Sequence, residues 1–154
     1  MAKKTETKAV KKIEKVVQKL LELLEIEAKL AVEKEEDVFQ VQLEASDPGV
    51  LIGYHGETLR ALQRMVAMIV YRQTGEWLKI VVNVGDYRQR RQESLEKMAL
   101  TASQKAKLSQ QSQALPPMPP AERRIIHLVL AEEPEVETIS EGEDRERHVV
   151  IRPK

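Results

Sequence analysis

The sequence predicts an α+β protein built from two small modules. Segments in which apolar residues recur every three or four positions alternate with segments in which they recur every second position, as expected for amphipathic helices and half-buried strands. With 154 residues, 42% of them apolar, the chain can form one ordinary domain or two small ones with packed cores. The two halves show no internal repeat, and a second unit begins near Asp86, so the predicted domains are residues 1–85 and 86–154.

The first half is predicted to follow the order α-β-β-α-α-β. Its predicted elements are a helix at about 6–25, a strand at 26–32, a charged turn at 33–37, a strand at 39–45, a short helix at about 48–52, a longer helix from about 57 to 74 and a strand at 78–84. The clearest strand alternates apolar Phe39, Val41 and Leu43 with polar neighbours. Asp47 and Pro48 form a helix-start signature, with a polar cap before a proline in the first turn.

The second half is predicted to be more helical and to contain a proline-rich connection. Its predicted elements are a long helix at about 87–106, a polar hinge at 109–113, an extended segment at 115–120, a short helix at 121–131 and strands at 136–140 and 148–151. The segment Leu115–Pro120 cannot be helical, because proline lacks the backbone N–H that a helix needs. Basic residues predominate from Asp86 to Arg124 and acidic ones from Glu132 to Glu146. These runs fit either ordinary solvated faces or a basic helical face beside an acidic rim.

The most informative motif is the Gly-x-x-Gly turn that precedes the longer helix. Gly53 and Gly56 enclose Tyr54 and His55. Two glycines this close allow the backbone to approach another molecule, and the helix N-terminus behind them offers N–H groups and partial positive charge. We therefore expect a phosphate of a single-stranded nucleic acid here, with Ile52 walling a narrow groove and Arg60, one turn into the helix, reaching a neighbouring phosphate. The alternative is a plain helix-to-helix turn that needs glycine only for its positive φ.

A second candidate site lies on the predicted helix at 121–131. Arg123 and His127 are four residues apart and so share one face. Guanidinium suits phosphate or a base plane, and imidazole offers a donor whose charge depends on pH. Arg124 points about 100° away and is a less direct contributor. The alternatives are a salt bridge from Arg123 to a neighbouring glutamate, at 122, 132 or 133, and a packed, satisfied histidine.

Composition excludes several classes of protein. The chain has 25 basic and 25 acidic residues, so diffuse polybasic coating of nucleic acid is not expected and any site must be local. The absence of cysteine fits a reducing, cytoplasmic location. No apolar run approaches the roughly 20 residues of a membrane span, so no membrane insertion is expected. Aromatic residues make up only 3%, which disfavours modules that read bases by stacking.

An enzyme is the main reading from a different class, and the residues do not favour it. The three histidines form no metal-ligand spacing, no Walker-type phosphate loop is present, and no signature groups a nucleophile with a base. We expect no catalytic activity, no cofactor and no metal.

The first half resembles a type II KH domain, on the stretch from Leu51 to Gln63 that contains the Gly-x-x-Gly turn. The second resembles a small α/β R-three-H domain, named for an arginine and a histidine separated by three residues, here Arg123 and His127 within Pro117–His127. The tail 136–143 and 149–154 is similar to the end of that module. A KH domain followed directly by an R-three-H domain is the arrangement of the bacterial Jag (SpoIIIJ-associated, KhpB or EloR) family.

That resemblance implies a binder of single-stranded RNA, acting as an RNA chaperone or post-transcriptional regulator in cell elongation and division. It also implies a KH-only protein partner. The alternatives left open are a single-stranded DNA binder and a protein-interaction scaffold that forms a homodimer or pairs with another KH protein. Members often carry an N-terminal Jag-N domain and a long linker, and this chain is expected to lack both. KH turns commonly hold basic residues, whereas this one holds Tyr54 and His55.

Overall fold

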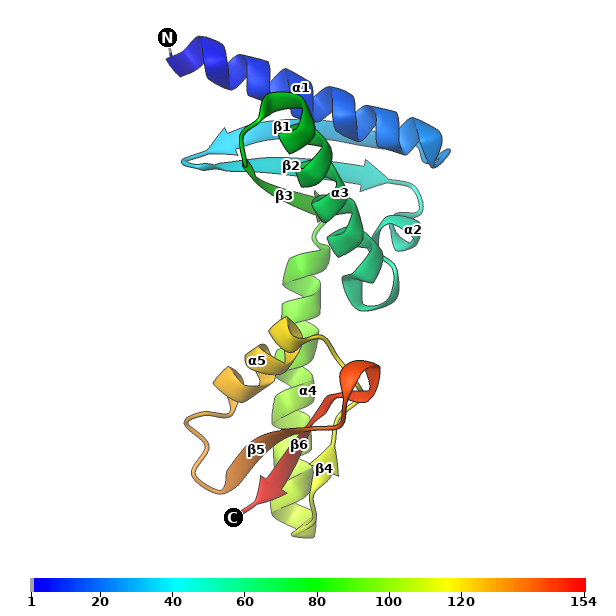
Figure 1. The fold of residues 1–154 in the computed structure, drawn as a ribbon. Coiled ribbons are helices and arrows are strands. Elements are labelled where there is room, and N and C mark those ends of the chain that lie inside the picture. The colour runs from blue at the N-terminus through cyan, green and yellow to red at the C-terminus, as the bar shows by residue number, and fades with distance from the viewer. Residues whose placement is uncertain (1) are drawn as a thin grey trace. The chain divides into compact units, whose positions relative to one another are not determined.

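The computed structural model describes residues 2–154, and the chain divides into two compact units between Tyr87 and Arg88 (Figure 1). The predicted α+β class is confirmed, because each unit combines helices with a three-stranded sheet. Each unit has its own buried apolar cluster.

The first unit follows the predicted order. Its elements are α1 (Ala2–Leu23), β1 (Ala28–Glu35), β2 (Val38–Ala45), α2 (Pro48–Ile52), a 3-10 turn (Tyr54–Gly56), α3 (Glu57–Thr74) and β3 (Lys79–Val84). The prediction of a turn from residue 33 is wrong, because β1 continues to Glu35. Backbone pairing with β2, such as Glu33 with Gln40, keeps the charged end of β1 in the sheet. Since β1 lies at a sheet edge, its charged side chains can reach water without breaking the ladder.

The sheet of the first unit has the order β1-β2-β3, antiparallel on one side of β2 and parallel on the other. Val41 stands between Val32 and Val82 in register, and all three are buried. Helices α1 and α3 pack on this sheet and on each other (Figure 1). Fully buried Ile13 of α1 and Val66 of α3 belong to the same cluster, so the core fixes where α3, and the turn before it, begins.

The second unit packs two helices on an antiparallel sheet of order β4-β6-β5 (Figure 1). Its elements are α4 (Tyr87–Ser109), β4 (Gln113–Ala114), α5 (Pro120–Val129), β5 (Val136–Glu141), a 3-10 turn (Asp144–Glu146) and β6 (His148–Pro153). Leu95 and Ala99 of α4, Ile126 of α5 and Ile151 of β6 are fully buried together. This cluster anchors α5, the helix that carries the second candidate site.

The predicted polar hinge at 109–113 is wrong at both ends. Helix α4 runs through Ser109, whose hydroxyl donates to the carbonyl of Lys105 (2.7 Å) and accepts from the amide of Gln111 (3.3 Å). Gln113 then begins β4, where it pairs with Ile151 of β6. A two-residue strand contains too few positions to show a periodicity, so the sequence pattern could not reveal it.

Candidate nucleic-acid interface

The turn between α2 and α3 adopts a backbone that requires glycine. Gly53 has φ 69° and ψ −172°, a region that is essentially restricted to glycine, and Gly56 is left-handed at φ 77°. A Cβ on Gly53 would lie 2.1 Å from the Oγ1 of Thr58. Between the glycines, His55 is itself left-handed at φ 50°. The chain therefore folds tightly against the start of α3.

The N-terminus of α3 has no side-chain cap. Gly56 occupies the cap position, so no side-chain oxygen accepts from the first-turn N–H groups as a serine or aspartate would. The N–H of Glu57 already donates to the carbonyl of Tyr54 in the preceding 3-10 turn, so the helix dipole and the later N–H groups of the first turn are what favour an anion here. The carboxylate of Glu57 in the same turn is exposed and also interacts favourably with the dipole, so an incoming phosphate must compete with it.

The two side chains inside the turn stack on each other. The ring centroids of Tyr54 and His55 are 4.0 Å apart, with 26° between the ring planes, and Tyr54 is 70% exposed. The Nη1 of Arg60 donates to the carbonyl of His55 at 3.3 Å. Arg60 thus lies at the turn and holds its backbone in place. Ile52 is half-buried and packs against the core of the first unit.

The second candidate site is built on α5. Arg123 is half-buried, and its Nε donates to the carbonyl of Met118 at 3.3 Å. Two of the glutamates considered as its alternative partners are engaged elsewhere, since Glu122 pairs with Arg91 and Glu133 with Lys107. Arg124 is exposed. Arg123 therefore keeps guanidinium N–H groups beyond the one that holds it to the backbone.

A buried ion pair ties α5 to α4 beside this site. The Nε and Nη2 of Arg91 donate to the two carboxylate oxygens of Glu122 at 2.9 and 2.8 Å. The side chains are only 20% and 9% exposed. Such a two-point contact fixes both the distance and the relative orientation of the guanidinium and carboxylate groups, and so of α4 and α5 at this point. Because Glu122 directly precedes Arg123, the pair also fixes where the Arg123 side chain starts.

His127 is held by two hydroxyl groups from β5. Its Nδ1 lies 2.6 Å from the Oγ1 of Thr138, and its Nε2 lies 3.0 Å from the Oγ of Ser140. Burial, and to a smaller extent the charge of Arg123, lowers the pKa of His127 below its ordinary value of 6.5. The histidine is thus satisfied within its own unit and favours the neutral form. The charge change expected near pH 6.5 is moved to lower pH.

The structure groups the predicted residues within the two units. Ile52, Gly53, Tyr54, His55, Gly56 and Arg60 gather at the N-terminus of α3, and Arg123, Arg124 and His127 lie on α5. Sequence reasoning missed Thr138 and Ser140, whose alternate spacing on a strand was the available signal. It also missed Arg91. Among the described side chains, those of residues 7–154, no cluster of three potential metal ligands occurs. No helix in the described part of the chain has the length and apolar character to cross a membrane.

Two family models match the chain. The KH domain of KhpA and KhpB matches residues 10–84, and the R-three-H domain matches residues 93–153. The RNA-binding protein KhpB of Clostridium symbiosum is 36% identical over 99% of this chain and 69% of the relative. KhpB of Bacillus subtilis is 30% identical over 96% of this chain and 74% of the relative. KhpB of Streptococcus pneumoniae D39 is 30% identical over 88% of this chain but only 41% of the relative, so the chain spans less than half of that protein.

Proposed function

The chain belongs to the KhpB family, whose members join a KH domain to an R-three-H domain, and from this premise we propose that it binds single-stranded RNA and does not catalyse a reaction. The resemblance to the family is thereby confirmed. The KhpB relatives carry the name RNA-binding protein, which supports the choice of ligand.

One observation carries the proposal, the glycine turn at the uncapped N-terminus of α3. Gly53 and Gly56 allow the tight backbone of the turn, with Thr58 packed on Gly53 and Tyr87 packed on Gly56. The N–H of Glu57 donates to the carbonyl of Tyr54, so the later N–H groups of the first turn of α3 would supply donors to a phosphodiester. The exposed Tyr54 ring, backed by His55, offers one flat face to a neighbouring base. A groove of this type takes about four nucleotides. Ile52 forms its wall, and Arg60, which donates to the carbonyl of His55, supplies a positive charge at the turn.

The R-three-H unit would provide the second contact. Arg123 directs its remaining N–H groups to a phosphate or a base plane, with Arg124 as an exposed second cation. His127 acts mainly in the neutral form, holding β5 against α5 through Thr138 and Ser140. Two weak sites on one chain bind more tightly than either alone, through effective concentration.

Fluorescence anisotropy with a labelled single-stranded RNA of about 12 nucleotides tests the proposal, since that length covers two sites of about four nucleotides and a spacer. The variant Tyr54→Asp/His55→Asp should bind at least about tenfold more weakly, because two carboxylates would face the phosphate and the stacking surface is lost. The matched control Gln18→Glu/Gln104→Glu adds the same charge at exposed helical positions and should leave affinity nearly unchanged.

An equal loss in both variants would mean diffuse electrostatics rather than the turn. Unchanged affinity in the turn variant would remove the turn from the site. Far-UV circular dichroism establishes that each variant is folded. A DNA oligonucleotide of the same sequence, measured in parallel, decides between RNA and the alternative of single-stranded DNA.

A protein-interaction role is the second candidate, and one observation favours it. Met65 and Met68 on α3 are 45% and 50% exposed, which leaves apolar surface on the KH unit. We propose that this surface pairs with a KH-only protein or with a second copy. Analytical ultracentrifugation with and without RNA tests this. A dimer that persists regardless of RNA and is lost in Met65→Ser/Met68→Ser supports a scaffold, and a monomer at all concentrations excludes the homodimer.

The cellular role proposed for the chain is that of an RNA chaperone or post-transcriptional regulator in the cytoplasm, linked to cell elongation and division. Crosslinking in cells followed by sequencing of the bound RNA tests this role. Recovery of no RNA above the background of the Tyr54→Asp/His55→Asp variant would contradict it.

A further inference from the structure

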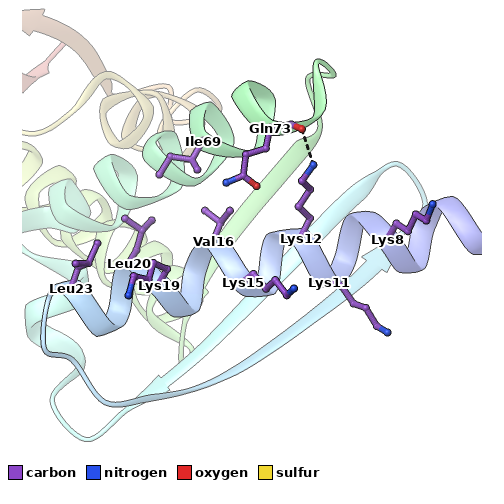
Figure 2. Close-up of a pocket in the computed structure, with 10 residues that line it drawn as sticks. All are labelled: Lys8, Lys11, Lys12, Lys15, Val16, Lys19, Leu20, Leu23, Ile69 and Gln73. Atoms are coloured by element: carbon purple, nitrogen blue, oxygen red, sulfur yellow. Dashed lines mark hydrogen bonds between the residues drawn. The ribbon is translucent and has the colours of Figure 1, made fainter.

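A groove of about 690 Å³ lies between α1 and α3 in the first unit (Figure 2). Its floor is apolar, with Val16, Leu20 and Leu23 from α1 and Ile69 from α3. Around this floor stand five lysines of α1, namely Lys8, Lys11, Lys12, Lys15 and Lys19. The groove therefore combines an apolar floor with a basic rim.

This groove is separate from the glycine turn. Its two α3 residues, Ile69 and Gln73, are 13 and 17 positions after Gly56. At 1.5 Å per residue, they lie about 20–25 Å further along the helix axis. A nucleotide bound at the turn therefore does not fill the groove.

The walls of the groove are fixed by contacts in the first unit. The Nζ of Lys12 donates to the carbonyl of Gln73 at 2.7 Å and joins α1 to the end of α3 (Figure 2). Val16 and Leu20 are buried in the common core. Leu23, in contrast, is 68% exposed at the end of the floor. An exposed leucine beside a basic rim offers apolar contact to a partner.

The arrangement of charge and apolar surface selects the kind of partner. Lysine stems lie along apolar surface while their ammonium groups reach polar surroundings. Here the ammonium group of Lys12 donates to the carbonyl of Gln73 and that of Lys19 pairs with exposed Glu22 at 3.2 Å. A polynucleotide would satisfy the ammonium groups but not the floor, because none of the ten residues that line the groove is aromatic and bases would have nothing to stack on. A flat lipid surface would not fill a concave groove. An amphipathic helix with acidic flanks satisfies both parts.

The length of the basic row agrees with such a helix. Lys8 and Lys19 are eleven residues apart on α1, which corresponds to about 16 Å or three helical turns. Carboxylates spaced one turn apart along a bound helix can therefore face the lysines of this row. For Lys12 and Lys19 they would replace the present partners, the Gln73 carbonyl and the Glu22 carboxylate. The apolar face of the same helix would cover Leu23 and Ile69.

We propose that the groove between α1 and α3 binds an acidic amphipathic helix of a partner protein. This proposal does not rest on RNA binding, because it uses neither the glycine turn nor α5. The full chain would then engage RNA and a protein at the same time.

The test uses a fluorescein-labelled synthetic peptide of about 14 residues, four turns of helix, with leucines on one face and glutamates on both flanks. Anisotropy with the full chain should show saturable binding that weakens as salt is raised. The variant Lys8→Glu/Lys15→Glu should bind about tenfold more weakly, through loss of two attractive contacts and gain of two repulsive ones. Lys97→Glu/Lys105→Glu, the same charge change on exposed residues of α4, should bind within about twofold of the original chain.

A variant of the floor tests the apolar half. Leu23→Ser removes an exposed side chain, so the fold is retained, and peptide affinity should fall several-fold while RNA affinity is unchanged. A scrambled peptide of identical composition that binds equally well overturns the proposal. Three other results would also overturn it, because each assigns the groove to another occupant. Displacement of the peptide by oligouridine would indicate a nucleic acid. Binding of anionic vesicles that is lost in Lys8→Glu/Lys15→Glu would indicate a lipid surface, and a monomer–dimer equilibrium that this variant shifts would indicate a second copy of the chain.

Discussion

Replacing Gly53 by alanine should destabilise the first unit far more than the same change at another left-handed glycine. The backbone of Gly53 costs any other residue about 1–3 kcal/mol in strain. In addition, the new Cβ would lie 2.1 Å from the Oγ1 and 2.7 Å from the Cβ of Thr58, an overlap that adds about 1–3 kcal/mol. We expect a total loss of about 2–6 kcal/mol in the free energy of unfolding.

Gly75 provides the matched control. It has the same positive φ of 77° as Gly56, but a Cβ there meets nothing within 4 Å. Gly75→Ala should therefore cost only the left-handed conformation, about 1–2 kcal/mol. The difference between the two variants contains the overlap with Thr58 and the more restrictive backbone of Gly53, whose ψ is −172° against 0° at Gly75.

Urea unfolding followed by tryptophan fluorescence measures this difference. Trp77 is the single tryptophan of the chain, and it stacks on Tyr71 within the first unit at 4.3 Å. Its signal thus reports on the unit that contains Gly53. A second substitution, Thr58→Ala, removes the closest atom and should recover part of the loss in the Gly53→Ala background. If Gly53→Ala costs no more than Gly75→Ala, the turn is not constrained as described.

Three further predictions concern the second unit and the charge of the site. Glu122→Gln should lower the free energy of unfolding of the second unit by about 2–4 kcal/mol, because it leaves the largely buried guanidinium of Arg91 without its carboxylate. The control Glu132→Gln, at an exposed position, should cost less than about 0.5 kcal/mol. Equal losses in the two variants, measured by unfolding followed with circular dichroism, would contradict the role of the pair. The pKa of His127 is lowered by burial, so the unfolded state binds the proton more readily than the folded state. The free energy of unfolding therefore contains a contribution from His127 that is present above about pH 6.5 and is lost as pH falls below that value. NMR titration of the ring should therefore show a midpoint below 6.5, and His127→Gln should flatten stability in that window; a midpoint above 6.5 would refute the assignment. RNA affinity should fall with salt with a log–log slope of about −2, for three phosphate contacts at ~0.7 each, and a slope several times steeper would indicate polybasic binding.

The local parts of the fold were predictable from the sequence. The apolar stripe Leu59, Leu62, Met65, Val66 and Ile69 predicts α3. Leu59, Leu62 and Val66 are buried and Ile69 is partly buried. The place of Met65 in the core stripe is wrong, because its side chain is 45% exposed. The glycine turn is recognisable in the sequence because its glycines and the helix that follows it are contiguous along the chain. By contrast, the strand orders β1-β2-β3 and β4-β6-β5 depend on pairings between distant segments, which periodicity does not encode.

The second site shows the same limit more sharply. Arg123 and His127 were identified from their spacing on one helix. The partners of the histidine, Thr138 and Ser140, are 11 and 13 residues away along the chain. Arg91, which pairs with Glu122 next to Arg123, is 31 residues from Glu122. The pKa of His127 depends on burial created by those tertiary contacts. A sequence pattern can therefore locate an ionisable residue without predicting its protonation.

The glycine-restricted backbone of the turn before α3 has a kinetic consequence. Because Thr58 packs on Gly53, Tyr87 packs on Gly56 and Arg60 donates to the carbonyl of His55 in the free protein, the loop has little disorder to lose when a ligand arrives. Association should then proceed by rigid docking at similar rates for different oligonucleotides. Discrimination among oligonucleotide sequences would then lie in their dissociation rates from the protein.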